Sequence, residues 1–259
     1  MIAVHGLAKA FGALHAVSDL DFEARAGGVT SIIGPNGAGK STVFNLIAGT
    51  LRPDAGRVEM AGRDITGLAP HRLADLGLAR SFQISNLFFG LTTHENVRLA
   101  CQARAPRRRF LAGLARETSL AERTDAILAE FGLADLADEP AASLSHGDQR
   151  RLEIALCMAT EPRVLLLDEP TQGMSPAETL AVDRLIKSLA GRVSVLMIEH
   201  DVDLVMGVSD HVIVLHQGRK LFEGTPAQVR DSSAVREAYL GVDPGSDPGS
   251  DPGAGHAAA

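Results

Sequence analysis

The chain has 259 residues, a net charge of -7 and a hydrophobic fraction of 45%, enough for one large domain or two small ones with a sizeable core. Aromatic residues make up only 4%, and this aliphatic composition favours helices packed on a parallel sheet, an α/β fold. The negative charge argues against binding to nucleic acid. Cys101 and Cys157 lie outside any C-x-x-C or Cys/His cluster, so neither a disulfide framework nor a zinc site is indicated.

Residues 1–28 mix short alternating apolar runs with Gly and Asp breaks, which is typical of antiparallel β structure. The continuous apolar run VTSII at 29–33 then predicts a buried strand, and the glycine-rich GPNGAGKS and the helix-patterned TVFNLIAGTL follow it. In this strand–loop–helix context, residues 34–41 match the full G-x-x-x-x-G-K-[ST] pattern. We therefore predict a phosphate-binding loop at the start of a helix.

The residue types of this loop suit a nucleotide phosphate. Lys40 supplies a positive charge toward the β- and γ-phosphates, and the Ser41 hydroxyl can coordinate Mg²⁺. A glycine-rich turn without nucleotide would not account for the complete motif. We expect the nucleotide to contact Gly34, Pro35, Asn36, Gly37, Ala38, Gly39, Lys40, Ser41 and Thr42.

Two later apolar runs end on polar residues, VLLLDEP at 164–170 and VSVLMIEH at 193–200. Open α/β sheets bind ligands at the carboxyl ends of their strands. We therefore predict that Asp168 holds Mg²⁺, directly or through water, and that Glu169 orients or deprotonates the attacking water. His200 is predicted to contact the γ-phosphate or hold that water. The alternatives, a strand that merely ends on polar residues and a structural histidine, are outweighed by the upstream phosphate loop.

A mostly helical pattern covers residues 91–159, between the predicted core strands. Thr92 with Glu95, and Ser175 with Glu178, have the spacing of capping boxes at helix starts. Gln83 precedes the helical stretch, where its side chain could reach Mg²⁺ or the attacking water, although a surface glutamine is the alternative. Because core strands stand on both sides, the helices are expected to be a subdomain inserted into one core.

In their shared order and spacing these motifs resemble the nucleotide-binding subunit of an ATP-binding cassette (ABC) transporter over about residues 1–241. The resemblance implies a P-loop NTPase core with a mainly parallel sheet, an N-terminal antiparallel β subdomain and a helical subdomain inserted at about 86–158. It also implies that Phe11 stacks on adenine, with Val17 packing nearby. Ordinary core packing is an equal alternative for Phe11.

The family's signature usually reads L-S-G-G-Q, and here it reads LSHGD at 144–148. The resemblance implies that this segment, Leu144 included, contacts the ATP of a partner subunit. Ser145 offers a hydroxyl at a helix N-cap, and Gly147 offers a backbone N–H that can approach phosphate closely. Asp148 would repel a γ-phosphate, so its side chain is predicted to face away. His146 could add a donor or occupy the rim.

Phrases such as QRRLEIALCMATEPRVLLLDEPTQGMSP are similar to the ATPase subunits of branched-chain amino acid importers, and urea and short-chain amide importers have closely similar subunits. This likeness implies ATP and Mg²⁺ as cofactors and a second ABC ATPase subunit, a paralogue or another copy, that closes head to tail. It also implies two integral membrane permease subunits and, indirectly, a solute-binding protein. A peripheral position on the cytoplasmic face of the inner membrane is expected, since no transmembrane or signal-peptide pattern is present.

The sequence disfavours two other classes of protein. A soluble ABC ATPase acting on nucleic acid is disfavoured by the single cassette, the missing heptad run and the acidic balance. A GTPase would need N-K-x-D, which is absent, and a small-molecule kinase would not explain residues 144–156.

Seven arginines lie between Arg98 and Arg123. We hypothesise that some of them contact membrane subunits or lipid headgroups, whereas the alternative is a solvated face. Charge reversal would separate these, through its effect on stimulation of ATP hydrolysis by the membrane subunits. The residues concerned are Arg104, Arg107, Arg108 and Arg109. The tail, residues 242–259, repeats Asp-Pro-Gly-Ser and is expected to be disordered.

Overall fold

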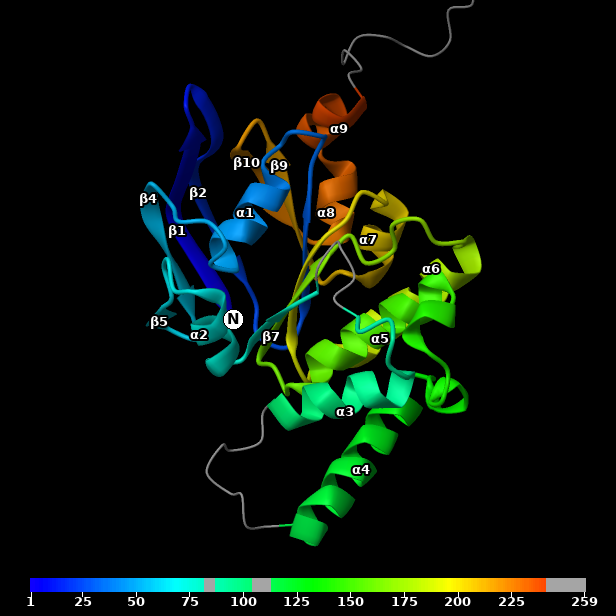
Figure 1. Ribbon diagram of the computed structural model, residues 1–259. Helices are drawn as coiled ribbons and strands as arrows, with labels where there is room; N and C mark the ends of the chain where they lie inside the picture. Colours follow the sequence, from blue (N-terminus) through cyan, green and yellow to red (C-terminus); the bar gives the residue numbers. More distant parts are fainter. Residues whose placement is uncertain (82–86, 104–112, 241–259) are drawn as a thin grey trace, which may run out of the picture.

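Two sheets organise the computed structural model, which describes residues 1–81, 87–103 and 113–240 (Figure 1). The first sheet is antiparallel, in the order β2-β1-β4-β5, and its strands are β1 (Ile2–Phe11), β2 (Leu14–Ala24), β4 (Ala55–Met60) and β5 (Arg63–Asp64). The second has the order β10-β9-β3-β8-β7-β6, and its strands are β3 (Val29–Ile33), β6 (Leu78–Arg80), β7 (Val164–Asp168), β8 (Ser194–Ile198), β9 (His211–His216) and β10 (Arg219–Gly224).

The second sheet is mainly parallel. Strand β8 pairs with β3 on one side and β7 on the other, β9 pairs with β3, and β6 pairs with β7, all in parallel. Only β10, among the described strands of this sheet, runs antiparallel, as the second arm of a hairpin with β9. The predicted α/β fold with an antiparallel N-terminal region and a mainly parallel core sheet is therefore confirmed. The stretch HVIVLHQGRKLFEG, two short β-rich runs around a glycine, also predicts a hairpin, and β9 and β10 form it.

The apolar strands of the parallel sheet bury both of their faces, because successive side chains point to opposite sides. Leu166 and Leu196 belong to the core cluster shared with Phe44 of helix α1 (Lys40–Ile47) and with the antiparallel sheet. Leu165 and Met197 belong to the cluster on the other face, together with α5, α6 and α7. Helix α1 thus lies between the two sheets, as Figure 1 shows.

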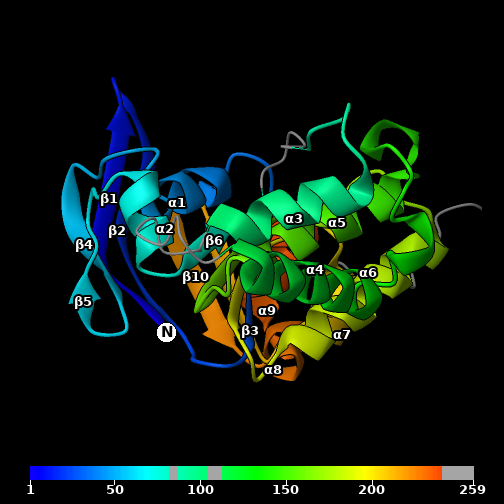
Figure 2. The ribbon, with the colours of Figure 1, turned by 60° about the horizontal axis from the view of Figure 1, so that its bottom comes forward.

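Most of the remaining helices pack on the second face of the sheet, whereas α2 packs through Leu73 on the same side as α1. Helices α3, α4 and α5 contact one another, and Figure 2 shows them as one group. The helices beyond α1 are α2 (Pro70–Asp75), α3 (Thr93–Ala103), α4 (Gly113–Glu130), α5 (His146–Ala159), α6 (Pro176–Leu189), α7 (Val202–Val208), α8 (Pro226–Asp231) and α9 (Ser233–Leu240), with short 3-10 turns η1 (Ala134–Leu136) and η2 (Ala141–Ser143).

Both predicted capping boxes are present. The Thr92 N–H donates to Glu95 Oε2 at 2.9 Å and the Glu95 N–H donates to Thr92 Oγ1 at 3.1 Å, at the start of α3. Ser175 and Glu178 make the same reciprocal pair at the start of α6. Each box satisfies N–H groups that a helix start leaves without an internal partner.

Several sequence predictions fall outside the described residues. These are Gln83, the arginines at 104 and 107–109, and the tail at 242–259. The division into a core and a helical subdomain at about 86–158 stays a prediction, although α3, α4 and α5 do lie between β6 and β7 in the chain. Each helix in the described ranges is too short or too polar to cross a membrane.

Strand β8 joins the two halves of the parallel sheet, so a cavity in it should weaken the whole core. Leu196 is 1% exposed. We expect Leu196→Ala to lower the free energy of unfolding by about 2–5 kcal/mol, since truncating a buried leucine loses transfer energy and leaves a cavity. Urea denaturation would measure it. The matched control is Leu180→Ala on α6, where the leucine is 55% exposed, and a comparable loss there would contradict the expectation.

Candidate ATP-binding site

The predicted phosphate loop connects β3 to α1 through a turn that demands glycine. Gly39, the N-cap of α1, has φ of 98°, and a Cβ on it would lie 2.4 Å from the carbonyl oxygen of Ala16. Only glycine tolerates both the left-handed backbone and this close approach. No side chain caps α1, and its first turn carries no acidic residue. Its first N–H groups and the helix dipole therefore favour an anion.

A cavity of about 540 Å³ opens at this loop. Phe11 is among the residues that line it and is 47% exposed, so ordinary core packing is the wrong reading of this side chain. Val17 is 1% exposed within the core and does not line the cavity. The lining consists of Phe11, Leu14, His15, Ala16, Asn36, Gly37, Ala38, Gly39, Lys40, Ser41, Thr42, Glu169, His200 and Gln217.

The Lys40 side chain is folded back onto the phosphate loop. Its Nζ donates to the carbonyl oxygen of Gly34 at 2.6 Å and to that of Pro35 at 3.0 Å, and the residue is 5% exposed. Burial lowers the pKa of Lys40, while the negative charge of Glu169 acts in the opposite direction. The Lys40 ammonium thus donates to carbonyl oxygens of the loop, and phosphate oxygens could accept the same hydrogen bonds in their place.

Glu169 and His200 meet at the carboxyl ends of the neighbouring strands β7 and β8. Glu169 Oε1 lies 2.5 Å from His200 Nε2, and both residues line the cavity at the phosphate loop. The glutamate side chain is 10% exposed and the histidine side chain 45%. Parallel pairing of β7 with β8 produces this contact, because strands aligned in parallel end at the same edge of the sheet.

Glu169 also has an unusual backbone. Its φ is 47°, a left-handed conformation that costs a residue with a side chain about 1–2 kcal/mol. The Glu169 N–H donates to the carbonyl oxygen of Ile198 at 3.0 Å, which extends the pairing with β8 by one residue. Such strain persists only where the surroundings hold the backbone in place, and it concentrates at functional sites.

Asp168 is 4% exposed and does not line the cavity itself. Its Oδ2 accepts a hydrogen bond of 2.8 Å from Arg80 Nη2, and Arg80 Nη1 donates to Asn45 Oδ1 on α1 at 2.7 Å. The Ser41 hydroxyl and the Asp168 carboxylate are hard oxygen donors of the kind that Mg²⁺ prefers, and Mg²⁺ usually takes only one or two protein ligands beside phosphate and water. These residues therefore fit a magnesium ion.

Arg80 and Glu199 are site residues that the sequence analysis missed. Glu199 is 3% exposed, and its Oε1 accepts hydrogen bonds from the Thr171 N–H at 3.0 Å and from Thr171 Oγ1 at 2.6 Å. It thereby ties the loop after β7 to the end of β8. A carboxylate directly before His200, at the end of an apolar run, was the available signal for it.

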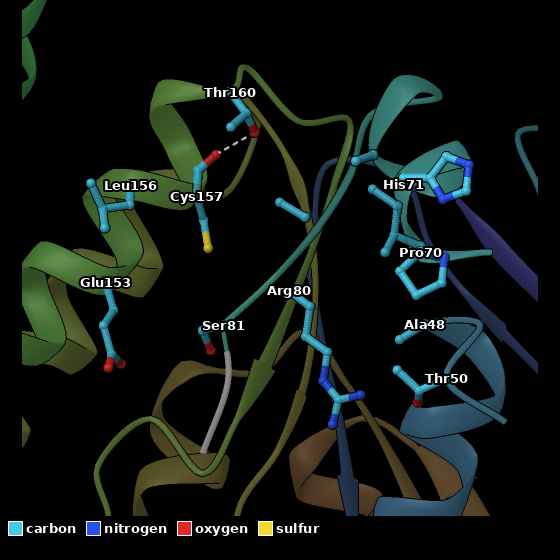
Figure 3. Close-up of a pocket in the computed structure, with 13 residues that line it drawn as sticks. Ala48, Thr50, Pro70, His71, Arg80, Ser81, Glu153, Leu156, Cys157 and Thr160 are labelled. Atoms are coloured by element: carbon cyan, nitrogen blue, oxygen red, sulfur yellow. Dashed lines mark hydrogen bonds between the residues drawn. The ribbon is translucent and has the colours of Figure 1, made fainter. Parts of the chain in front are cut away.

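A second cavity, of about 490 Å³, lies behind this site. Figure 3 shows Arg80 between Glu153 and Cys157 of α5 on one side and Ala48 and Thr50 on the other, with its guanidinium group pointing along the cavity. Arg80 therefore both lines this cavity and binds the carboxylate of Asp168.

The signature segment closes on itself at the start of α5. Ser145 Oγ accepts from the Asp148 N–H at 3.1 Å and donates to Asp148 Oδ2 at 2.7 Å, and Asp148 Oδ1 accepts from Arg151. The Gly147 N–H donates to Glu178 Oε1 of the α6 capping box at 3.1 Å. The hydroxyl of Ser145 and the N–H of Gly147 are thus both bound to carboxylates of the same chain.

A Cβ on Gly147 would lie 2.8 Å from Glu178 Oε1, so a larger residue there would displace the Glu178 side chain. Hydrogen bonds from Ser175 and from Gly147 lower the pKa of Glu178. Leu144 is buried ahead of the helix. His146 lines a small cavity of about 140 Å³ together with Glu169.

Comparison with known proteins agrees with this geometry. The ABC transporter family model matches residues 17–172, and the model described as branched-chain amino acid ATP-binding cassette transporter matches residues 219–244. The chain belongs to the ABC transporter family, which confirms the resemblance found in the sequence.

Within this family, curated relatives match nearly end to end. The chain is 44% identical to BraF of Pseudomonas aeruginosa, a high-affinity branched-chain amino acid transport ATP-binding protein, over 93% of this chain and 98% of BraF. It is 40% identical to LivG of Escherichia coli, with the same description, over 93% and 98%. It is 36% identical to LptB of Acidithiobacillus ferridurans, the ATP-binding protein of a lipopolysaccharide export system, over 93% and 97%.

Solved structures place the fold in the same group. The ADP conformation of MJ1267, an ATP-binding cassette of an ABC transporter, superimposes with a TM-score of 0.81 at 30% identity and covers 93% of this chain and 99% of its own. A dimeric post-hydrolysis structure of the cassette MJ0796, bound to ADP and Pi, gives 0.74 at 26% identity over 87% and 99%.

The contact of Asp148 with Arg151 allows a test of the altered signature. Because Arg151 already balances the Asp148 carboxylate, we expect Asp148→Gln to change ATP-driven dimerisation by less than tenfold. Sedimentation velocity over an ATP titration would measure this, with Ser145→Ala as the comparison that should weaken the dimer. A tenfold tighter dimer in Asp148→Gln would show instead that this carboxylate repels the partner's phosphate.

Proposed function

We propose that this chain is the ATP-hydrolysing subunit that powers a branched-chain amino acid importer. The observation that carries the proposal is the end-to-end match to BraF and LivG, together with the branched-chain family match over 219–244, which includes β10, α8 and α9. Similarity over the length of the cassette does not by itself identify the transported molecule, because LptB, from a lipopolysaccharide export system, is 36% identical over the same 93% of this chain. An importer of urea or short-chain amides is the alternative.

The nucleotide is proposed to lie along the cavity at the phosphate loop. Phe11 supplies an exposed aromatic face for adenine at one end, Leu14, His15 and Ala16 line the cavity with it, and Val17 packs nearby in the core. At the other end, the loop N–H groups of residues 34–42 and the Lys40 ammonium bind the phosphates. Lys40 exchanges its bonds to Gly34 and Pro35 for phosphate oxygens.

Magnesium is proposed to be held by Ser41, with Asp168 acting through water, since Asp168 does not line the cavity. Gln83 is proposed as a further ligand. A bound magnesium ion would neutralise part of the charge that develops on the phosphates. Arg80 keeps the Asp168 carboxylate in one orientation for this purpose.

Hydrolysis is proposed to use Glu169 as the general base. Its carboxylate takes a proton from a water molecule placed in line with the γ-phosphate, and His200, 2.5 Å away, orients both groups. The burial of Glu169, against the exposure of His200, suits a base that must be shielded and a histidine that must reach the phosphate.

The dimer is proposed to form head to tail, with the signature of one subunit on the ATP of the other. Ser145 and Gly147 would release Asp148 and Glu178 and bind the partner's γ-phosphate instead, with Leu144, His146 and Asp148 at the rim. The partner is a related ATPase subunit or a second copy. Two membrane permease subunits, and through them a solute-binding protein, would use the cycle from the cytoplasmic face of the inner membrane. No nucleic acid takes part.

The proposed base gives a direct prediction. We expect Glu169→Gln to bind ATP as the wild type does, but to hydrolyse it about a hundredfold or more slowly, as removal of a preorganised transition-state contact typically does. The closed dimer should accumulate in ATP. Phosphate release and gel filtration would measure these two effects, with Glu130→Gln on α4 as control. Normal turnover in Glu169→Gln would remove Glu169 from the proposed role.

The importer itself needs a test with partners. The chain would be co-purified with its membrane subunits, placed in proteoliposomes and assayed for ATP hydrolysis with solute-binding protein that is empty, loaded with leucine or loaded with urea. Stimulation by the leucine-loaded protein alone supports the proposal. Stimulation by urea alone would favour the alternative importer, and binding to nucleic acid without membrane partners would contradict both.

A further inference from the structure

Arg150 of α5 is a buried arginine bound to the end of the catalytic strand. It is 9% exposed, its Nη2 donates to the carbonyl oxygen of Asp168 at 2.5 Å, and its Nε donates to that of Pro170 at 3.1 Å. Its Nη1 donates to Glu153 Oε2 at 2.6 Å, one helical turn further along. A single guanidinium group therefore binds both carbonyls that flank Glu169.

These bonds fix the peptide unit that precedes Glu169 and the one that follows Pro170. The peptide that joins Asp168 to Glu169 is trans, so its N–H and its carbonyl point in opposite directions. The N–H donates to Ile198 of β8 at 3.0 Å, and the carbonyl accepts from Arg150 on the other side. The Glu169 carbonyl, in the peptide that follows, accepts from the Gln172 N–H at 3.3 Å, and the carbonyl after that, of Pro170, accepts from Arg150. The φ and ψ angles of Glu169 lie between two anchored peptide groups.

Such anchoring is what the left-handed φ of 47° at Glu169 requires. Within the part of the chain that the structure describes, the pairing of β6 with β7 ends at Leu166, before Glu169. The planar, always charged guanidinium can bind two carbonyls and a carboxylate at once, which a lysine cannot. Arg150 thus binds a carbonyl of β7 beyond the last residue that pairs with β6.

We propose that Arg150 is a positioning residue for Glu169, an inference that rests on the proposed role of Glu169 as general base. Arg150 does not touch the nucleotide. It acts through the backbone, and it lines, with His146 and Glu169, the small cavity between α5 and the strand end. Ser145 and Gly147 lie at the start of the same helix, so α5 carries both the signature segment and the arginine that positions Glu169.

The test replaces the buried ion pair by apolar residues. Replacing a buried pair by side chains of similar volume is often neutral for folding, whereas removing one partner is not. We expect Arg150→Met/Glu153→Leu to bind ATP with a KM within twofold of the wild type and to lose at least tenfold in kcat. Arg150→Lys, which keeps the charge beside Glu153 but reaches fewer acceptors, should fall in between and decides the matter if the double variant does not fold.

A spectroscopic readout separates positioning from general structural support. The imidazole ¹⁵N chemical shifts of His200 report its contact with Glu169, so they should move in Arg150→Lys. The matched control is Arg123→Lys, because Arg123 also binds a backbone carbonyl of α5, that of Ala159 at 2.7 Å, and a carboxylate, Glu161, but at the far end of the helix. In this control kcat and the His200 shifts should not change.

The outcomes are distinct. A folded Arg150 variant with kcat within twofold of the wild type and unmoved His200 shifts would overturn the positioning role while wild-type hydrolysis stands. A wild-type complex that hydrolyses no ATP would instead refute the proposed function. A fall in kcat at constant KM, together with moved His200 shifts, supports the inference.

Discussion

The parallel pairing of β8 between β3 and β7 is the constraint on which the site depends. It brings three strand ends to one edge of the sheet, so that the phosphate loop, Glu169 and His200 line one cavity although they are far apart in the chain. Each of the three strands is buried along its whole length, and their side chains contribute to both core clusters. The catalytic geometry is therefore set by the packing of the core.

Buried charges then adjust this edge in a way that apolar packing cannot. Arg80 orients the carboxylate of Asp168, Arg150 holds the backbone around Glu169, and Glu199 ties the following loop to β8. Each of these groups is largely removed from water and would be costly if it were unpaired. Their hydrogen bonds go to parts of the site that must keep a fixed orientation. The cost of burial is thus offset where precision matters for chemistry.

The sequence predicted the elements that local patterns encode, and it missed those that depend on distant contacts. The phosphate loop, the strand ends, the hairpin at β9 and both capping boxes follow from residues within a few positions of one another. Arg80 and Asp168 are 88 positions apart, and Arg150 is 18 positions from Asp168. A signal was available for Arg150, because Gly147, Arg150 and Ile154 form a buried face at helical spacing. The resemblance implied that Val17 packs near the adenine, and Val17 lies buried in the core directly after Leu14, His15 and Ala16, which line the cavity.

In the signature segment, the donors proposed to bind a partner's phosphate are already bound to carboxylates of the same chain. The donors of Ser145 and Gly147 would be left partly unsatisfied in a single subunit, and the carboxylates of Asp148 and Glu178 occupy them. In the proposed dimer, a phosphate from the partner would have to displace groups of like charge, so closure would exchange one set of charge-assisted hydrogen bonds for another and gain only their difference. Glu178 belongs to the capping box of α6, and its release would also loosen the start of that helix. Dimer closure should therefore be felt at both α5 and α6, on the two sides of the strand end that Arg150 holds.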